Sequence, residues 1–302
     1  MSRLKRERFF VISFDKAMTE YLDDCNKRNL SEKSIHYYEY ELNRFIKSIK
    51  IKDIKNLNQE VLDKYLEVVE TEYSYNEISY NSLARILNLF FAFIYKKDYT
   101  TTQLKIPYKK VTQKIKQLPT EKEVQRLLIA PQLSYCSYND YMAFVVCSII
   151  MGNGMRIGSI AALRKSDLNF KDHIIYVRQT KGRREQHVFM SKKLEKVLKE
   201  YLNVLDDDSD ALFIGSDGKP LTGNAIAQAV TRYAKNRGVN GISPHKLRHF
   251  FARSYILNGG DVYSLSKVLF HKNLQTTEIY LSTLNVDNFK NSIEKYNVLD
   301  RL

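Results

Sequence analysis

The sequence is 302 residues long, and its 48 Lys and Arg residues against 34 Asp and Glu leave a net charge of +14. This length predicts two domains, each large enough to bury its own core. Both parts of the chain are basic, because residues 1–116 carry 22 basic and 16 acidic side chains and residues 117–302 carry 26 and 18. Such a spread of charge suits two domains that wrap a polyanion, although a solvated, Lys-rich surface explains it equally well.

The cysteines and the N-terminal residues exclude several classes of protein. Cys25, Cys136 and Cys147 are odd in number and lack CxxC spacing, so they predict thiols of a reducing cytosol and exclude a disulfide framework or zinc site. The first residues, MSRLKRERFFVISFD, contain no apolar run long enough for a signal peptide, and no stretch is long enough to span a membrane. We therefore expect a cytoplasmic protein with no membrane partner.

Residues 10–97 predict four amphipathic helices, because apolar residues recur there at steps of three and four. The four apolar stripes comprise Phe14, Met18, Tyr21, Leu22 and Cys25; Ile35, Tyr38, Leu42, Phe45 and Ile49; Val61, Leu62, Tyr65, Leu66 and Val69; and Leu83, Ile86, Leu87, Phe90 and Ile94. Ser31 and Asn58 are the expected N-caps of the second and third helices. Four such helices with short connections predict a small bundle.

A basic segment follows the four predicted helices. No acidic residue lies between Asp98 and Glu121, and the basic side chains there are Lys105, Lys109, Lys110, Lys114 and Lys116. Pro107 and Pro119 interrupt regular structure near its ends. The sequence therefore predicts a helical domain over 1–103, an extended linker over 104–119 and a second domain over 120–302. The linker suits a phosphate backbone, or it is only a solvated connection.

The second domain is predicted to be mainly helical with one β-hairpin. The β-prone runs His173–Thr180 and Glu185–Met190 flank the turn residues Lys181–Arg184. Helical patterning returns over 242–284. The expected fold class is thus mainly α with a small hairpin or sheet, an α+β arrangement.

A cluster of basic residues follows Ser243 and Pro244, which predict a helix start as N-cap and first helical residue. In the run HKLRH, His245 and Arg248 are three residues apart and share a helix face, so they can protonate and clamp a phosphate together. The alternative is a zinc site at His245 and His249. Against this, Lys246 stands where the helix of a zinc hydrolase carries its Glu.

A second candidate lies in the run LFHKNLQTTEIY, where Thr276 or Thr277 can cap a short helix that holds Tyr280 in its first turns. The chain has 21 tyrosines, so a single Tyr is more typical of packing than of a nucleophile. Only the surrounding pattern favours a catalytic tyrosine.

That pattern resembles the phage-integrase and Xer-type tyrosine recombinase family, in which H-x-L-R-H is followed by L-G-H and T-T-x-x-Y. Here HKLRH, LFH and TTEIY occur in that order, with 23 residues from Arg248 to His271 and nine from His271 to Tyr280. Upstream, GMRI and ALRKSDL look like the family's T-G-L-R-I-S-E and A-L-x-W-x-D, and TKG resembles the turn that carries its lysine. The specific resemblance covers 120–284. Residues 10–97 show only a compatible helical pattern, like the family's core-binding domain.

The resemblance implies an active site made of Arg156, Lys181, His245, Arg248, His271 and Tyr280. Its two guanidiniums would hold the non-bridging phosphate oxygens in the pentavalent transition state. Tyr280 would be the nucleophile, with His245 in the proton transfer and Lys181 as general acid at the leaving 5′ oxygen. His271 would hydrogen-bond the phosphate. Because the bond energy is kept in a 3′-phosphotyrosine, neither ATP nor a metal is implied as a cofactor.

Two positions depart from the family pattern. Ser159 replaces an acidic residue three positions after the first arginine, so one supporting carboxylate is missing. Phe270 replaces the Gly before the second-motif His, which removes a flexible backbone point and adds bulk.

The resemblance also implies partners. Family members clamp double-stranded DNA between two domains and act as a homo-tetramer on two DNA sites, with a Holliday junction as intermediate. The segment Val286–Asn297 is amphipathic and would dock on a neighbouring protomer, or on its own domain. Three other functions stay open: a DNA-binding architectural protein, a metal-dependent nuclease and a type IB topoisomerase-like enzyme.

Overall fold

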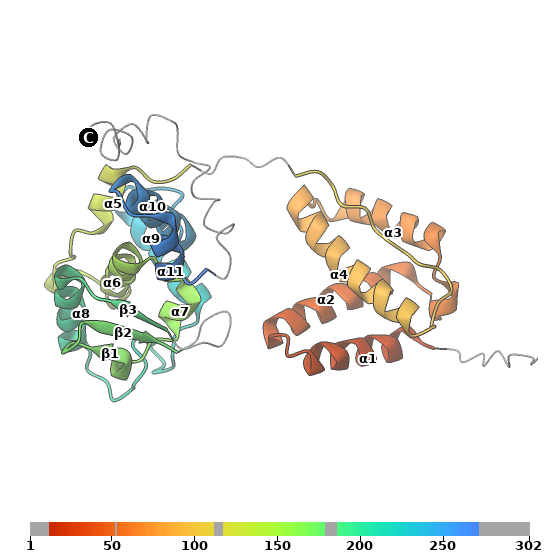
Figure 1. The fold of residues 1–302 in the computed structure, drawn as a ribbon, viewed down its shortest axis with the longest axis horizontal. Coiled ribbons are helices and arrows are strands. Elements are labelled where there is room, and N and C mark those ends of the chain that lie inside the picture. Colours follow the sequence, from red (N-terminus) through yellow and green to blue (C-terminus); the bar gives the residue numbers. More distant parts are fainter. Residues whose placement is uncertain (1–11, 52, 112–116, 179–185, 272–302) are drawn as a thin grey trace, which may run out of the picture. The chain divides into compact units, whose positions relative to one another are not determined.

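The computed structural model describes residues 12–51, 53–111, 117–178 and 186–271. The chain divides between Lys114 and Ile115 into two compact units, which we call unit 1 and unit 2 (Figure 1). Each unit has a hydrophobic core of its own. No helix within the described ranges is both long and apolar enough to cross a membrane.

Unit 1 is a helical bundle, as the apolar stripes predicted. Its elements are α1 (Phe14–Lys27), α2 (Glu32–Ile49), the 3-10 turn η1 (Ile54–Asn56), α3 (Gln59–Glu72) and α4 (Glu77–Lys96). The predicted caps are confirmed, since Ser31 and Asn58 each accept a hydrogen bond from the backbone amide three residues later. The stripes meet in an aromatic core, where Phe45 packs edge-to-face against Tyr65 and Phe91.

The first part of the predicted linker packs on unit 1. Leu104 and Ile106 are buried in its core, because two asparagines of α4 hold the segment in an extended form. Asn88 exchanges hydrogen bonds of 2.7 and 2.9 Å with the backbone of Ile106, and Asn81 exchanges two of 2.8 Å with Lys109. The Lys109 ammonium lies 2.6 Å from a carboxylate oxygen of Glu70.

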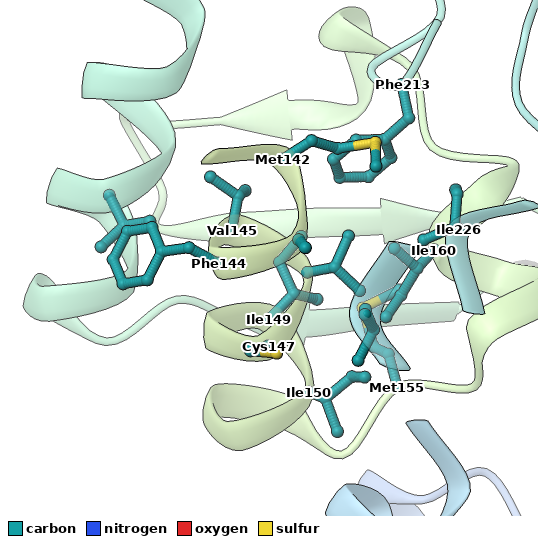
Figure 2. Packing of buried hydrophobic residues seen from close by; sticks show 14 of the residues in the cluster. Met142, Phe144, Val145, Cys147, Ile149, Ile150, Met155, Ile160, Phe213 and Ile226 are labelled. Carbon is teal, nitrogen blue, oxygen red and sulfur yellow. The ribbon is translucent and has the colours of Figure 1, made fainter. Parts of the chain in front are cut away.

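Unit 2 is built around one buried helix, α6 (Tyr138–Asn153). Its side chains are apolar on all sides, which is typical of a helix enclosed by other elements. Figure 2 shows Phe144 and Ile149 leaving α6 on different sides and meeting other parts of the core. The helices around it are α5 (Glu121–Leu127), α7 (Ile157–Ala161), α8 (Lys192–Val204), α9 (Gly223–Asn236), α10 (Pro244–Leu257) and α11 (Val262–Val268), with 3-10 turns η2 (Leu133–Tyr135) and η3 (Lys165–Asp167).

An antiparallel sheet of order β1–β2–β3 completes the described part of unit 2. The predicted hairpin is confirmed, because β2 (Ile174–Val177) pairs with β3 (Gln186–Phe189) in a register that places Ile175 opposite Val188. Strand β1 (Leu168–Asn169) was not expected, since two residues carry no periodic signal. The predicted turn, with Lys181, lies outside the described residues.

Candidate active site

The start of α10 presents three of the basic side chains singled out in the sequence. Ser243 accepts a hydrogen bond from the backbone amide of Lys246, and Pro244 occupies the first helical position, as predicted. His245, Arg248 and His249 follow at helical spacing, so they lie on neighbouring positions of one side of the helix. Arg248 is only 4% exposed, whereas His245 is exposed.

Arg248 is held by backbone carbonyls from two distant segments. Its Nη1 donates to the carbonyl of Gly154, and its Nη2 donates to the carbonyl of Leu269 at 2.8 Å. Gly154 ends α6 and Leu269 ends α11. A buried guanidinium requires such acceptors, because an unpaired charge inside a protein costs several kcal/mol. The arginine therefore fastens the ends of these two helices to α10.

Gly154 fits this junction for two reasons. Its φ of +62° lies in the left-handed region, which glycine adopts without the clash of a Cβ. In addition, a Cβ there would lie 2.5 Å from Cδ1 of Phe251 and 2.7 Å from Cδ2 of Leu269. The tight turn brings Arg156, two residues later, to the N-cap position of α7.

Arg156 reaches the same chain segment as Arg248. Its Nη1 lies 3.5 Å from the carbonyl oxygen of Phe270. Phe270 directly follows Leu269, whose carbonyl accepts from Arg248. Two guanidiniums from separate helix ends thus converge on two consecutive carbonyls. Convergent guanidiniums are suited to bind a phosphate, since each can offer paired N–H donors to its oxygens.

The C-terminal turn of α11 leaves the carbonyls of Leu269 and Phe270 available to the two arginines. The amide of His271 donates to Ser266 O at 2.9 Å, and the amide of Phe270 donates to Lys267 O at 3.0 Å. These two bonds form a Schellman motif with Phe270 at its left-handed position, at a φ of +53°. The family pattern has a Gly at this position, where this chain has Phe270. The structure explains why glycine suits it, because a side chain at positive φ costs about 1–2 kcal/mol.

His271 completes the cluster as a neutral imidazole. Its Nε2 lies 2.9 Å from Nη2 of Arg248, and because a guanidinium only donates, that nitrogen must be the acceptor. Burial, with the positive charges of Arg248 and Arg156, lowers the pKa of His271 to about 4. At neutral pH the ring therefore carries its proton on Nδ1, and that N–H is its donor.

The base of the predicted lysine-bearing turn is anchored to a buried carboxylate. Asp167 is 1% exposed, accepts from the amide of Arg164 at 3.0 Å, and pairs with Nε of Arg178, the residue that follows β2. Asp167 is the Asp of the ALRKSDL motif. The predicted general acid, Lys181, and the predicted nucleophile, Tyr280, lie outside the described residues.

The structure therefore brings together Arg156, Arg248 and His271, and it places His245 one turn before Arg248 on α10. The backbone acceptors of this cluster could not be predicted from the sequence, because main-chain oxygens leave no mark in the residue pattern. Within the described ranges, no three His, Cys, Asp or Glu side chains gather as metal ligands.

A site of two guanidiniums and a neutral imidazole, where the ends of α6, α7 and α11 meet α10, is suited to bind phosphate groups. The sequence profile of the phage integrase family matches residues 118–285, which is more than half of the chain. The protein belongs to this family.

Relatives agree with this assignment. The chain is 25% identical over 293 residues to tyrosine recombinase XerA of Thermococcus onnurineus (strain NA1), an alignment that covers 96% of this chain and 98% of that protein. It is 32% identical over 143 residues to tyrosine recombinase XerC of Lactobacillus leichmannii, where the match covers 45% of this chain and 48% of that protein.

Solved structures show the same fold. A lambda integrase tetramer bound to a Holliday junction superposes with a TM-score of 0.72 at 15% identity, covering 90% of this chain and 78% of the other. XerH recombinase bound to its difH substrate superposes with a TM-score of 0.68 at 20% identity, covering 94% and 84%. The two-part, mostly helical fold is thus the fold of tyrosine recombinases.

We expect Gly154→Ala to destabilise unit 2 by about 3 kcal/mol, because strain at positive φ adds to overpacking against Phe251 and Leu269. Urea unfolding followed by circular dichroism measures this loss. Gly218→Ala is the matched control, since Gly218 has a φ of +72° and nothing within 4 Å of its Cβ position. The control should lose only about 1 kcal/mol. Equal losses in the two variants would contradict the close packing at Gly154.

We expect the Phe270→Gly variant to have a free energy of unfolding about 1 kcal/mol higher than that of Phe270→Ala. Both variants lack the Phe ring, but only alanine keeps the strain of the left-handed backbone. The difference is measured between Phe270→Gly and Phe270→Ala by urea unfolding. Arg232, which is exposed within α9, supplies the control. There the Arg232→Gly variant should be less stable than Arg232→Ala by about 1 kcal/mol. The same order at both positions would show that residue 270 is not strained.

Proposed function

We propose that the protein is a site-specific DNA recombinase that cuts and rejoins double-stranded DNA through a 3′-phosphotyrosine at Tyr280. The observation that carries the proposal is the convergence of Arg156 and Arg248 on the consecutive carbonyls of Phe270 and Leu269, within the part of the chain that the family profile matches. The carbonyls hold both cations in place before DNA arrives. Such preorganised charge lowers a barrier without a cost of rearrangement during the reaction.

The proposed cleavage step gives each of these residues a role. The two guanidiniums bind the non-bridging oxygens of the scissile phosphate and stabilise the charge that grows in the pentavalent transition state. Tyr280 Oη attacks phosphorus as its proton passes to His245, and the bond from phosphorus to the 5′ oxygen breaks. Lys181 gives the proton that this leaving oxygen needs. His271 donates to a phosphate oxygen.

Rejoining reverses these steps with a different 5′ hydroxyl. That oxygen attacks the phosphotyrosine as its proton returns to Lys181, the bond from Tyr280 to phosphorus breaks, and the proton on His245 returns to the phenolate. One phosphodiester is exchanged for another through the phosphotyrosine ester, so the number of phosphoester bonds does not change. The chemistry needs no ATP, and the two guanidiniums supply the positive charge that a metal supplies elsewhere.

We further propose that residues 1–103 form a core-binding domain, that 104–119 act as a linker along the DNA, and that 120–302 form the catalytic domain. By analogy with the lambda integrase tetramer on a Holliday junction, four copies would act on two DNA sites, in the cytoplasm. The net charge of +14 supports a long contact with phosphates, since each neutralised phosphate releases a counterion.

The experiment begins with duplexes selected by the protein from random DNA. Two copies of the selected site are placed in one supercoiled plasmid, and the protein is added with EDTA and without ATP. We expect recombinant circles, together with a detergent-resistant adduct on the 3′ side of the cut. Cleavage that requires Mg²⁺ and leaves no adduct would identify a nuclease. Relaxation of a plasmid without the site would favour a topoisomerase-like enzyme, and binding without cleavage an architectural protein.

A further inference from the structure

A second histidine stands beside His245 on α10. His249 lies one turn further along the helix, and the Nε2 atoms of the two rings are 2.9 Å apart. The rings are nearly perpendicular, at 88°, with centroids separated by 4.4 Å. The helix that carries them is fixed at its start by the Ser243 cap and at Arg248 by the backbone carbonyls described above.

This geometry requires one proton between the two rings. A hydrogen bond between two imidazole nitrogens needs one N–H and one lone pair, so it cannot form when both Nε2 atoms are protonated. Two adjacent imidazoliums would also repel each other and the nearby guanidinium of Arg248. The pair therefore holds at most one positive charge while the contact persists.

The direction of the hydrogen bond follows from the role of His245, so this step rests on the proposed function. If His249 were the donor, the lone pair of His245 would already be engaged, and His245 would have no nitrogen with which to accept a proton. If His245 donates from Nε2, its Nδ1 keeps the lone pair and can act as a base. The resulting imidazolium then remains hydrogen-bonded to a neutral acceptor.

Burial supports the same assignment of charge. His249 is half-buried, whereas His245 is exposed, so desolvation opposes a charge more strongly on His249. His249 is thereby suited to stay neutral as the proton moves. This is the arrangement of an acid–base group held in one tautomer by a third residue, as in catalytic triads.

We propose that His249 is a positioning residue, which fixes the tautomer of His245 through the Nε2–Nε2 hydrogen bond and stabilises the imidazolium formed when His245 takes the proton of Tyr280. The proton goes to Nδ1 of His245, and the Nε2 proton stays on His245. His249 touches neither DNA nor the reacting atoms in this scheme.

Two substitutions separate this role from simple packing. His249→Phe keeps a planar ring and removes both nitrogens, whereas His249→Gln keeps a donor and an acceptor at similar reach. Cleavage is measured in single turnover, with saturating selected duplex that carries a nick to trap the adduct. We expect His249→Phe to be slowed roughly ten- to hundredfold, with its Kd for the duplex within about twofold of the original protein. His249→Gln should recover to within roughly fivefold of the original rate.

Nitrogen-15 NMR of the imidazoles provides a readout that does not depend on activity. The chain has six histidines, so single substitutions assign the signals. We expect His245 to be in the Nε2–H tautomer in the original protein and in a mixture of tautomers in His249→Phe. His36→Gln is the control, because His36 is 79% exposed on α2 and should change neither the His245 signal nor cleavage.

The outcomes are distinct. A His249→Phe variant that cleaves at the original rate overturns the proposal, and so does equal slowing of the Phe and Gln variants, since that pattern indicates packing alone. A His245 tautomer unchanged in His249→Phe overturns it as well. Slowing of the Phe variant, recovery with Gln and a changed tautomer support it. Failure of the proposed function is seen separately, as an adduct that forms without Tyr280.

Discussion

Tyr280→Phe is expected to bind the selected duplex normally and to form no covalent adduct. Phenylalanine has no oxygen with which to attack phosphorus, so this side chain can no longer form the adduct. Removal of a catalytic nucleophile typically costs a factor of about a million in rate. The Kd for the duplex should stay within about twofold of that of the original protein, because one hydroxyl contributes little beside many phosphate contacts.

A duplex with a nick close to the cleavage point measures this effect. The small fragment released on cleavage diffuses away, so rejoining is blocked and the adduct accumulates as a slow band in a denaturing gel. Tyr263→Phe is the matched control, because Tyr263 is 61% exposed on α11 and lies outside the proposed machinery. An adduct of normal yield in Tyr280→Phe would assign the nucleophile to another residue.

Arg248→Lys is expected to reduce cleavage at least about a hundredfold, which corresponds to roughly 3 kcal/mol of transition-state stabilisation. Lysine keeps the positive charge but loses the planar fork that binds two oxygens at once. The same substitution should lower the free energy of unfolding by about 2–4 kcal/mol, because Gly154 O and Leu269 O lose a donor while buried.

The comparison with Arg156→Lys separates catalysis from stability. Arg156 is only partly buried and reaches Phe270 O at 3.5 Å, whereas Arg248 is nearly buried and donates to the carbonyls of Gly154 and Leu269. We expect both lysine variants to cleave poorly, but only Arg248→Lys to unfold at distinctly lower urea concentration. Arg253→Lys, on the same helix, is the control for both measurements. Cleavage within a fewfold of normal in either variant would refute the phosphate clamp.

Local structure was largely predictable from the sequence. The apolar stripes of unit 1 and the caps Ser31, Asn58 and Ser243 follow from rules that act over four residues, so each could be read without the fold. The hairpin was predicted from β-prone runs on either side of a turn. Strand β1 was not, because two residues carry no periodic signal and its pairing with β2 is set by the tertiary structure.

The candidate site was only partly predictable. The residue types were available from the motifs, whereas the acceptors of Arg248 and Arg156 are main-chain oxygens and have no sequence signature. The Asn88–Ile106 and Asn81–Lys109 bonds were hidden for a related reason, since asparagine patterns do not reveal which backbone they will bind. The roles of Lys181 and Tyr280 stay predictions, because neither residue is among those described.

The way the two arginines are held has a consequence for the order of events during synthesis. The bonds from Arg248 to Gly154 and from Arg156 to Phe270 join residues 94 and 114 positions apart. Contacts of such long range form late, because the loop between them must close first. A chain growing on the ribosome cannot complete the clamp until residue 271 has emerged, even when unit 1 is already folded. The proposed phosphate clamp can therefore form only after most of unit 2 has been synthesised.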